Sequence, residues 1–294
     1  MKRLRSSPPH ELLAYETASR IWDDRDDGGL YGYRLTPEKR QQTTQLISEQ
    51  CLFCSSALLT ERLVHRPAVD ELAIGSCDTC GWWRIFHGTR GGQDTVNFEF
   101  VVAEAQRYDV DAVAAPIGSL RRHLRARPTD LAFVHPTTLE RLISDCLEDE
   151  FAPCEVIHLG GTGDGGVDLM LIESDRSPLL IQVKRRADIL GPQGLNVVRE
   201  LNGVLFREGL ARGMVVTTAD RYTRGARAEA VTRTGGLVSR YEMRLRAFDD
   251  IVAMLQLPRR TSSHPWVPYL APLRQSANAE WAEAVASYLD GPPS

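Results

Sequence analysis

The sequence lacks any long apolar run. None of its 294 residues belongs to an uninterrupted apolar segment of roughly 18 residues, the length that a membrane-spanning helix needs. The basic opening Met1-Lys-Arg-Leu-Arg5 has no apolar stretch behind it, so a secretory signal is not expected either. We therefore expect a protein that works in the cytoplasm and has no membrane partner.

The chain also lacks an excess of positive charge. It has 35 Lys and Arg against 39 Asp and Glu, a net charge of -4, whereas a nucleic-acid-binding domain is usually basic. The charge is unevenly spread, however. Residues 182–233 hold ten basic and five acidic residues, a difference of +5, and residues 131–181 hold two basic and ten acidic ones, a difference of -8. A locally basic face therefore remains compatible with binding phosphates.

Cysteine is scarce, and four of the six cysteines fall into two pairs. Cys51 and Cys54 form one Cys-x-x-Cys pair and Cys77 and Cys80 the other, a spacing that suits a metal in a reducing compartment better than a disulfide framework. Zn²⁺ accepts four thiolates in a tetrahedron, and such a closed site is structural. We therefore expect a zinc ribbon, with Gly81 in the turn after the second pair.

A chain of this length should hold about two domains. We expect four parts, namely an N-terminal region 1–45, a four-cysteine zinc-ribbon and helical region 46–130, an α/β domain 131–257 and a C-terminal extension 258–294. Residues 97–127 are predicted to be helical, and Pro128 and Pro136 mark the passage into the third part. A further helix is expected over 277–289.

The apolar positions of the third part change their period along the chain. Five of them follow the spacing of one helical face: Leu139, Leu142, Ile143, Cys146 and Leu147. The elements expected after this helix are strands over 154–159, 167–172 and 179–184, a helix over 195–207, a strand over 214–217, a helix over 223–233, a strand over 238–245 and a helix over 251–255. Glycine-rich residues 160–166 are expected to form a turn. The order predicts an α/β sandwich with a mixed sheet and an αβββαβ core.

Polar residues interrupt two of these strands. Asp168 is expected to face the same side as Met170, and the period of two places Gln182 and Lys184 on one face of the next strand. A hairpin would bring Asp168 beside Gln182 and Lys184. A carboxylate, an amide and a lysine on adjacent strands suit metal-assisted hydrolysis of a phosphodiester, because Asp168 would hold Mg²⁺ and Lys184 would orient water or neutralise charge.

Several motifs together resemble a known family. Gly163-Asp-Gly-Gly-Val-Asp168, Ile181-Gln-Val-Lys-Arg185, Arg199-Glu-Leu-Asn-Gly203 and Val215-Val-Thr-Thr-Ala219 look like the Mrr-type catalytic domain of the PD-(D/E)xK restriction-endonuclease-like superfamily. The resemblance covers about 137–257. It implies a magnesium-dependent DNA endonuclease, and it makes Gln182 a family trait in place of the usual acidic residue.

The resemblance also places a catalytic glutamate on the helix before the first strand, and Glu140 occupies that position. The segment Thr137-Thr-Leu-Glu140 equally fits a capping box, in which Glu140 would bond the backbone of Thr137. The residues leave both roles open.

Arginines near these motifs are the candidate DNA contacts. Arg185 and Arg186 follow the lysine directly, and Arg224 and Arg227 lie near the start of a predicted helix. Arginines three positions apart on a helix also fit an ordinary solvated face. The basic run 121–127 is a second candidate footprint.

We therefore expect a magnesium-dependent endonuclease of double-stranded DNA with a structural zinc, acting in restriction or defence against foreign DNA, including modified DNA. Its partners would be DNA, a second copy of the chain, because one site per chain cuts one strand, and proteins of a defence system. Two alternatives stay open: a non-catalytic DNA-binding subunit of a defence complex, and a nuclease acting on RNA or branched DNA.

Overall fold

The computed structural model describes residues 11–23, 45–46, 48–66, 70–90, 96–159, 166–231, 242–258, 264–276 and 278–291. Within these ranges no helix is both long and apolar enough to cross a membrane. The chain divides into two compact units. The α/β unit comprises Met1–Leu12 and Tyr108–Ser262, and the β-sheet unit comprises Leu13–Arg107 and Ser263–Ser294. The four-part division expected from the sequence stays a prediction.

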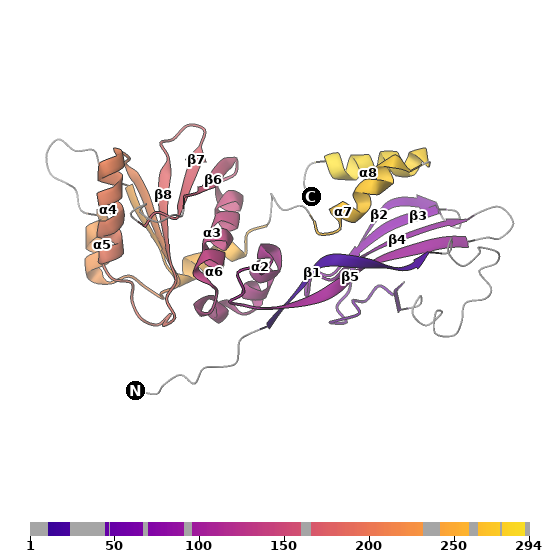
Figure 1. Ribbon diagram of the computed structural model, residues 1–294, viewed down its shortest axis with the longest axis horizontal. Coiled ribbons are helices and arrows are strands. Elements are labelled where there is room, and N and C mark those ends of the chain that lie inside the picture. Colours follow the sequence, from indigo (N-terminus) through magenta and orange to yellow (C-terminus); the bar gives the residue numbers. More distant parts are fainter. Residues whose placement is uncertain are drawn as a thin grey trace, which may run out of the picture. The chain divides into compact units, whose positions relative to one another are not determined.

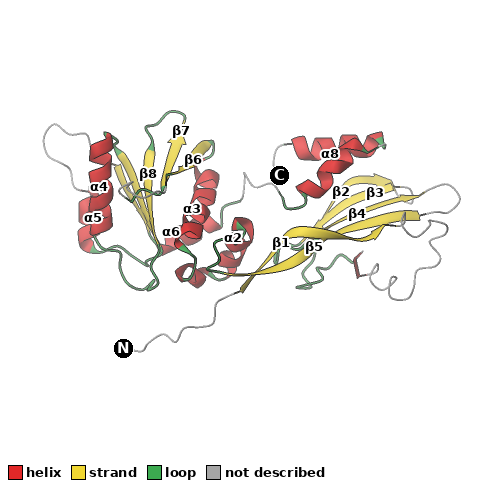
Figure 2. Cartoon of the chain, viewed as in Figure 1, coloured by secondary structure: helices red, strands yellow, loops and turns green. Residues whose placement is uncertain are grey.

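The β-sheet unit is built on five strands. They are β1 (Glu11–Asp23), β2 (Leu59–Arg66), β3 (Asp70–Ser76), β4 (Trp83–Arg90) and β5 (Val96–Asp109). The strand order is β1-β5-β4-β3-β2, and β2 to β5 pair antiparallel (Figure 2). The two Cys-x-x-Cys segments lie in turns of this unit, so the separate N-terminal region expected for them is confirmed.

The prediction of a helix over 97–127 is wrong for the first half of this range. Residues Val96–Asp109 form strand β5, and only Ile117–Ala126, named α2, is helical. Pairing with β4 on one side and β1 on the other decides the conformation, because the local preference of a segment is weak against its neighbours in a sheet.

Indole rings hold the β-sheet unit to its C-terminal helices, α7 (Val267–Leu270) and α8 (Ala279–Asp290). Trp83 is fully buried, and its Nε1 donates to the carbonyl oxygen of Tyr15 at 2.7 Å. Trp266 and Trp281 belong to the same core cluster. The expectation of a helix over 277–289 is confirmed, and this helix packs with the N-terminal sheet.

The α/β unit contains the predicted αβββαβ core. Its elements are α2, η1 (Pro128–Ala132), α3 (Pro136–Phe151), β6 (Cys154–His158), β7 (Leu169–Glu173), β8 (Leu179–Lys184), α4 (Asn196–Glu208), β9 (Arg212–Thr217), α5 (Arg224–Val231), β10 (Glu242–Arg246) and α6 (Phe248–Leu255). The sheet order is β10-β9-β8-β7-β6. Strands β6, β7 and β8 pair antiparallel, whereas β8, β9 and β10 pair parallel, so the sheet is mixed as expected.

Helices cover both faces of this sheet (Figure 1). On one face, Leu180 and Val215 pack against Val197 and Leu201 of α4. Helix α4 ends at Gly209, whose φ of +67° suits the left-handed turn that satisfies the last carbonyls of a helix. Helices α3 and α6 lie on the opposite face. Of the predicted turn 160–166, only Gly166 lies among the described residues. Residues 238–241, the first half of the strand expected over 238–245, also lie outside them, and the second half is in β10.

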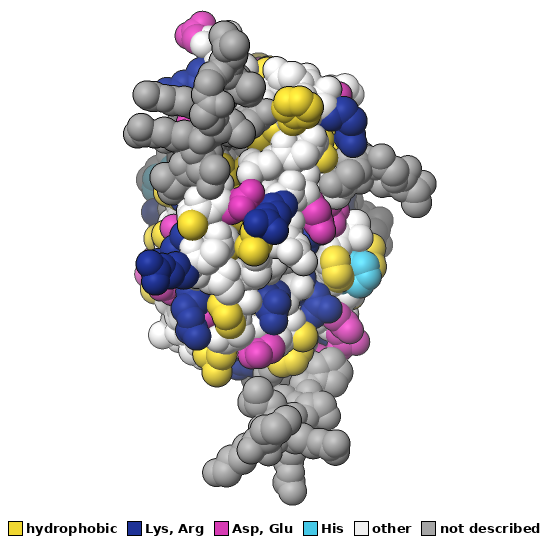
Figure 3. Space-filling model, turned by 90° about the vertical axis from the view of Figure 1, so that its left-hand side faces the viewer, with side chains coloured by type: hydrophobic (Ala, Val, Ile, Leu, Met, Phe, Trp, Pro, Cys, Tyr) yellow, Lys and Arg dark blue, Asp and Glu magenta, His cyan; other side chains and the backbone are white. Residues whose placement is uncertain are grey.

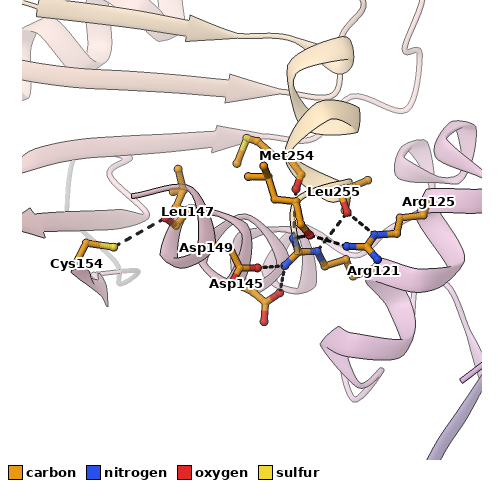
Figure 4. A network of polar contacts seen from close by, with 9 residues as sticks. Arg121, Arg125, Asp145, Leu147, Asp149, Cys154, Met254 and Leu255 are labelled. Carbon is orange, nitrogen blue, oxygen red and sulfur yellow. Dashed lines mark hydrogen bonds and ion pairs between the residues drawn. The ribbon is translucent and has the colours of Figure 1, made fainter. Parts of the chain in front are cut away.

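A buried arginine joins three helices of the α/β unit (Figure 4). Arg121 of α2 donates through Nη1 to Asp145 at 2.9 Å and to Asp149, both on α3. Its Nη2 donates to the carbonyl oxygens of Met254 at 3.3 Å and Leu257 at 2.8 Å, at the end of α6. The side chain of Arg121 is 1% exposed. It satisfies helix-end carbonyls that would otherwise lack a donor.

This arrangement corrects the expectation that the run 121–127 forms a second DNA footprint. Arg121 is buried, and the guanidinium of Arg125 is also turned to the backbone at the end of α6, since it donates to the carbonyls of Leu255 and Leu257. His123 contacts Asp130 at 2.7 Å. Arg121, His123 and Arg125 of this run are therefore engaged in contacts within the fold.

Replacing Arg121 by methionine should lower the free energy of unfolding by about 3–5 kcal/mol, because buried carboxylates lose their counter-charge. Urea unfolding of the full chain measures the change. The matched control is Arg207→Met, which breaks a solvent-exposed pair with Glu208 and should change stability by less than about 0.5 kcal/mol. Equal effects of the two substitutions would contradict the structural role of Arg121.

Candidate active site

Asp168 directly precedes strand β7 and is bonded to the neighbouring strand β8. The register of β7 and β8 ends with Leu169 opposite Ile181, and the backbone N–H of Asp168 donates to the carbonyl of Ile181 at 3.0 Å. The carboxylate Oδ2 of Asp168 accepts a hydrogen bond from the N–H of Val183 at 2.6 Å. The backbone of β8 therefore holds this carboxylate at Val183, the residue between Gln182 and Lys184.

Gln182 is an unusual residue for a central strand. Its side chain is 0% exposed, and among the described residues neither Nε2 nor Oε1 has a hydrogen-bond partner. A buried amide without partners costs about 1–3 kcal/mol for each unsatisfied group. Strand geometry places Lys184, two residues on, along the same face. The predicted grouping of a carboxylate, an amide and a lysine is thus brought to one end of β7 and β8.

Gly166 packs against this group and was not predicted as part of it. Its φ is +85°, and a Cβ atom built at this position would lie 2.5 Å from Nε2 of Gln182 and 4.0 Å from Nζ of Lys184. Only glycine combines that backbone conformation with that close approach. The glycine run before Asp168 was the available signal, but its contact with β8 depends on the fold. Asp164 lies outside the described residues.

Lys184 stands out in the composition. The sequence has three lysines against 32 arginines, and the other two lysines, Lys2 and Lys39, lie outside the described residues. An arginine would serve for a simple positive charge, whereas lysine offers a compact ammonium whose three donors rotate. A catalytic part for Lys184 stays a prediction.

Glu140 lies on α3, half-buried, one turn after the start of the helix. The helix begins at Pro136, a residue favoured at the first helical position. The N-terminal capping residue is His135, and it makes no side-chain capping bond. Thr137 is therefore inside the helix, and the capping-box interpretation of Thr137 and Glu140 is wrong. A catalytic part for Glu140 stays a prediction.

The four arginines predicted to contact DNA differ in their surroundings. Arg185 is exposed, and its Nη1 donates to the carbonyl of Ala132 at 2.7 Å. Arg186 is half-buried, with its backbone N–H bonded to Oγ1 of Thr218 at 2.7 Å. Arg224 and Arg227 are exposed on α5.

The basic stretch between 182 and 233 is partly neutralised within the fold. Ion pairs join Arg199 to Glu229 at 3.2 Å, Arg207 to Glu208 at 2.8 Å and Arg221 to Asp220 at 2.5 Å. Figure 3 looks onto the side where α4 and α5 lie in Figure 1, and it shows basic and acidic side chains interspersed. The local excess of +5 therefore does not produce a continuous basic surface on this side.

The four cysteines of the β-sheet unit meet in space. The Sγ atoms of Cys51 and Cys80 are 3.4 Å apart, as are those of Cys54 and Cys77, and all four lie within 4.8 Å of one another. Four thiolates at the Zn–S distance of roughly 2.3 Å would form a tetrahedron with edges of about 3.8 Å. The donor set and its dimensions therefore fit a structural zinc ion.

Two similar turns present these thiols. In the first, the N–H of Cys51 donates to Ser56 and the N–H of Ser55 to Cys51, and Ser55 has a φ of +60°. In the second, the N–H of Gly81 donates to the carbonyl of Cys77 at 2.7 Å, and Gly81 has a φ of +85°. The predicted turn at Gly81 is confirmed, and the left-handed residue closes each loop around its pair.

The thiols differ in acidity. Burial raises the pKa of Cys51 and Cys80. Burial also acts to raise the pKa of Cys54, but hydrogen bonds from the side chain and backbone of Ser56 outweigh it and lower this pKa to about 6. Because zinc binds thiolates, it would displace the protons that burial favours.

Comparison with known proteins identifies one part of the chain. Residues 131–255 match the family model described as a restriction endonuclease, the Mrr catalytic domain. The match runs from η1 to the end of α6 and so contains Asp168, Gln182 and Lys184. No curated protein and no solved structure matches the chain. The family resemblance predicted from the motifs is confirmed for this region.

Gly166→Ala should destabilise the α/β unit by about 1–3 kcal/mol, because alanine is strained at a φ of +85° and its Cβ would displace the amide of Gln182. Urea unfolding measures this. The control is Gly203→Ala on α4, where nothing lies within 4 Å and alanine should stabilise the helix by about 0.5–1 kcal/mol. If both variants gain stability, the close approach of Gly166 to Gln182 is wrong.

Freshly purified protein should contain about one zinc ion per chain if four thiolates share one ion. Elemental analysis of the full chain checks this, and Cys77→Ser should lose most of the metal. Cys146→Ser, at a buried cysteine of α3 outside the cluster, should keep it. Metal-free wild-type protein would contradict the assignment.

Proposed function

Because residues 131–255 are a restriction-endonuclease domain of the Mrr type, we propose that the protein is a magnesium-dependent endonuclease of double-stranded DNA. The observation that carries the proposal is the grouping of Asp168, Gln182 and Lys184 at one end of β7 and β8. A wholly buried amide without partners lowers the stability of the fold. Such a loss of stability is expected where a site binds a ligand.

The donor set fits Mg²⁺. The ion prefers oxygen ligands and is commonly held by one or two carboxylates with substrate phosphate and water. Asp168 would supply a carboxylate, Glu140 a second one from α3, and Oε1 of Gln182 an oxygen that has no partner among the described residues. When bound, Mg²⁺ polarises the scissile phosphate and lowers the pKa of a coordinated water.

The protein residues position the reactants. The hydrogen bond from Val183 to Oδ2 of Asp168 fixes the carboxylate, so its remaining lone pairs keep one direction. The ammonium of Lys184 would hold the attacking water or stabilise the charge that develops on the phosphate. The amide of Gln182 would donate to a water or a phosphate oxygen through Nε2.

Arg185, Arg186, Arg224 and Arg227 would contact DNA phosphates, and each phosphate that they neutralise releases a counterion. The mixed charge on the side of α4 and α5 limits indiscriminate binding. We further propose that the protein acts in the cytoplasm, where the zinc thiols stay reduced. There it would restrict foreign or modified DNA as a homodimer or with other defence proteins.

The test is plasmid cleavage with and without Mg²⁺. Asp168→Ala, Lys184→Ala and Lys184→Arg should each reduce nicking by about 10²–10⁴-fold, as expected when a group that orients or stabilises the reacting phosphate is removed. Asp175→Ala is the control for Asp168, because Asp175 is an exposed carboxylate in the turn between β7 and β8.

Equal nicking by the wild type and the Asp168 and Lys184 variants would show that the assigned residues are wrong. Full activity of Lys184→Arg would show that only a positive charge is needed there. Cleavage of RNA or branched DNA in preference to a plain duplex would change the substrate and keep the chemistry.

A further inference from the structure

Tyr15 of β1 has a buried hydroxyl group in the core of the β-sheet unit. The residue is 1% exposed, and among the described residues no group meets the distance and angle limits of a hydrogen bond with its Oη. Buried tyrosine hydroxyls usually have a partner, and one without a partner costs free energy that a phenylalanine would not. Packing alone therefore does not explain why this residue is a tyrosine.

Tyr15 contacts both of the turns that present the four thiols. Its carbonyl oxygen accepts the hydrogen bond from Nε1 of Trp83 at 2.7 Å, and Trp83 lies three residues after Cys80. Its ring meets the ring of Phe53 edge-on, with the two centroids 5.4 Å apart, and Phe53 lies inside the first Cys-x-x-Cys segment. The side chain is thus held against both turns.

The hydroxyl lies beside the thiols themselves. Burial raises the pKa of Tyr15 most, and the charge on Cys80 and a contact with its side chain raise this pKa next. The charges on Cys51 and Cys54 act on the pKa of Tyr15 in the same direction. Cys80 also packs against the core cluster to which Tyr15 belongs. The sulfur of Cys80 is therefore the acceptor that this hydroxyl can reach.

A zinc site of four thiolates needs hydrogen-bond donors around it. Four thiolates and one Zn²⁺ leave an excess of two negative charges, and a buried charge is costly unless hydrogen bonds reach it. The turns supply such bonds from their own backbone, for example from the N–H of Phe53 to Sγ of Cys51 at 3.5 Å. Tyr15 belongs to another strand, β1, and offers a side-chain donor at Cys80.

We propose that Tyr15 is a positioning residue of the zinc site, and that its hydroxyl donates a hydrogen bond to the thiolate of Cys80 when zinc is bound. Donors outside the ligand shell orient the metal ligands, and the loss of one lowers metal affinity by about 10- to 100-fold. The bond joins β1 to the zinc site, so zinc binding and the packing of β1 in the sheet stabilise each other. The inference concerns the zinc site and does not rest on the proposed nuclease function.

The experiment uses the full chain with Co²⁺ in place of zinc, because Co²⁺ also binds thiolates and its bonds to sulfur absorb light. A hydrogen bond draws electron density from the sulfur. The sulfur-to-cobalt charge-transfer band should therefore lie at longer wavelength in Tyr15→Phe than in the wild type. Competition with a zinc chelator should show that Tyr15→Phe binds zinc about 10- to 100-fold more weakly than the wild type.

The matched control is Tyr269→Phe. Oη of Tyr269 accepts a hydrogen bond from the N–H of Ala18, also on β1, at 2.8 Å, and its ring packs against Trp83 with the centroids 5.3 Å apart. This substitution removes a hydroxyl that bonds the backbone of the same strand and not a sulfur, so the band and the zinc affinity should stay at their wild-type values. Circular dichroism of the zinc-loaded proteins verifies that both variants are folded.

An unchanged charge-transfer band in Tyr15→Phe overturns the inference, because the hydroxyl then makes no bond to a sulfur. An equal loss of zinc affinity in Tyr15→Phe and Tyr269→Phe also overturns it, since any change in the packing of β1 would then have this effect. A Tyr15→Phe chain that does not fold with zinc overturns it as well, because the fold itself would need the hydroxyl. A wild type that binds neither metal contradicts both the inference and the zinc assignment, and leaves the proposed cleavage of DNA to its own test.

Discussion

The buried amide of Gln182 constrains which residues can lie next to it in the α/β unit. It sits in the central strand, wholly covered, with no hydrogen-bond partner among the described residues. The residue that packs against this amide has to be a glycine, since a Cβ at Gly166 would lie 2.5 Å from Nε2. Directly before the neighbouring strand, the carboxylate of Asp168 is held by the N–H of Val183, the residue that follows Gln182. A core that served stability alone would place an apolar side chain at this position.

The two units use charge and polarity in different ways. In the α/β unit, arginines that a count of charges assigns to nucleic acid are partly structural: Arg121 joins α2, α3 and α6 from a buried position. In the β-sheet unit, four thiols from two turns meet within 4.8 Å, and a metal bound there would add to the folding free energy of this unit. Residue type alone therefore does not identify the DNA-binding surface.

Much of this was accessible from the sequence, because it depends on local periodicity and spacing. The strand Leu179–Lys184 was predicted with its observed bounds, and the αβββαβ order and the two Cys-x-x-Cys turns follow from short-range patterns. What failed depends on contacts between distant residues. Residues 97–109 form a strand because β1 and β4 flank them, and Thr137 is inside α3 because Pro136 begins it. The approach of Gly166 to Gln182 also depends on the fold and produces no periodic pattern in the sequence.

Whether the amide of Gln182 is kept for a ligand can be measured through the free energy of unfolding of Gln182→Leu in urea, without DNA or added Mg²⁺. Leucine has a similar size and no polar atoms, so it removes the unsatisfied groups and leaves the packing. We expect the variant to be more stable than the wild type by about 1 kcal/mol or more. A variant less stable than the wild type would show that the fold itself satisfies the amide, and would contradict its being kept for a ligand.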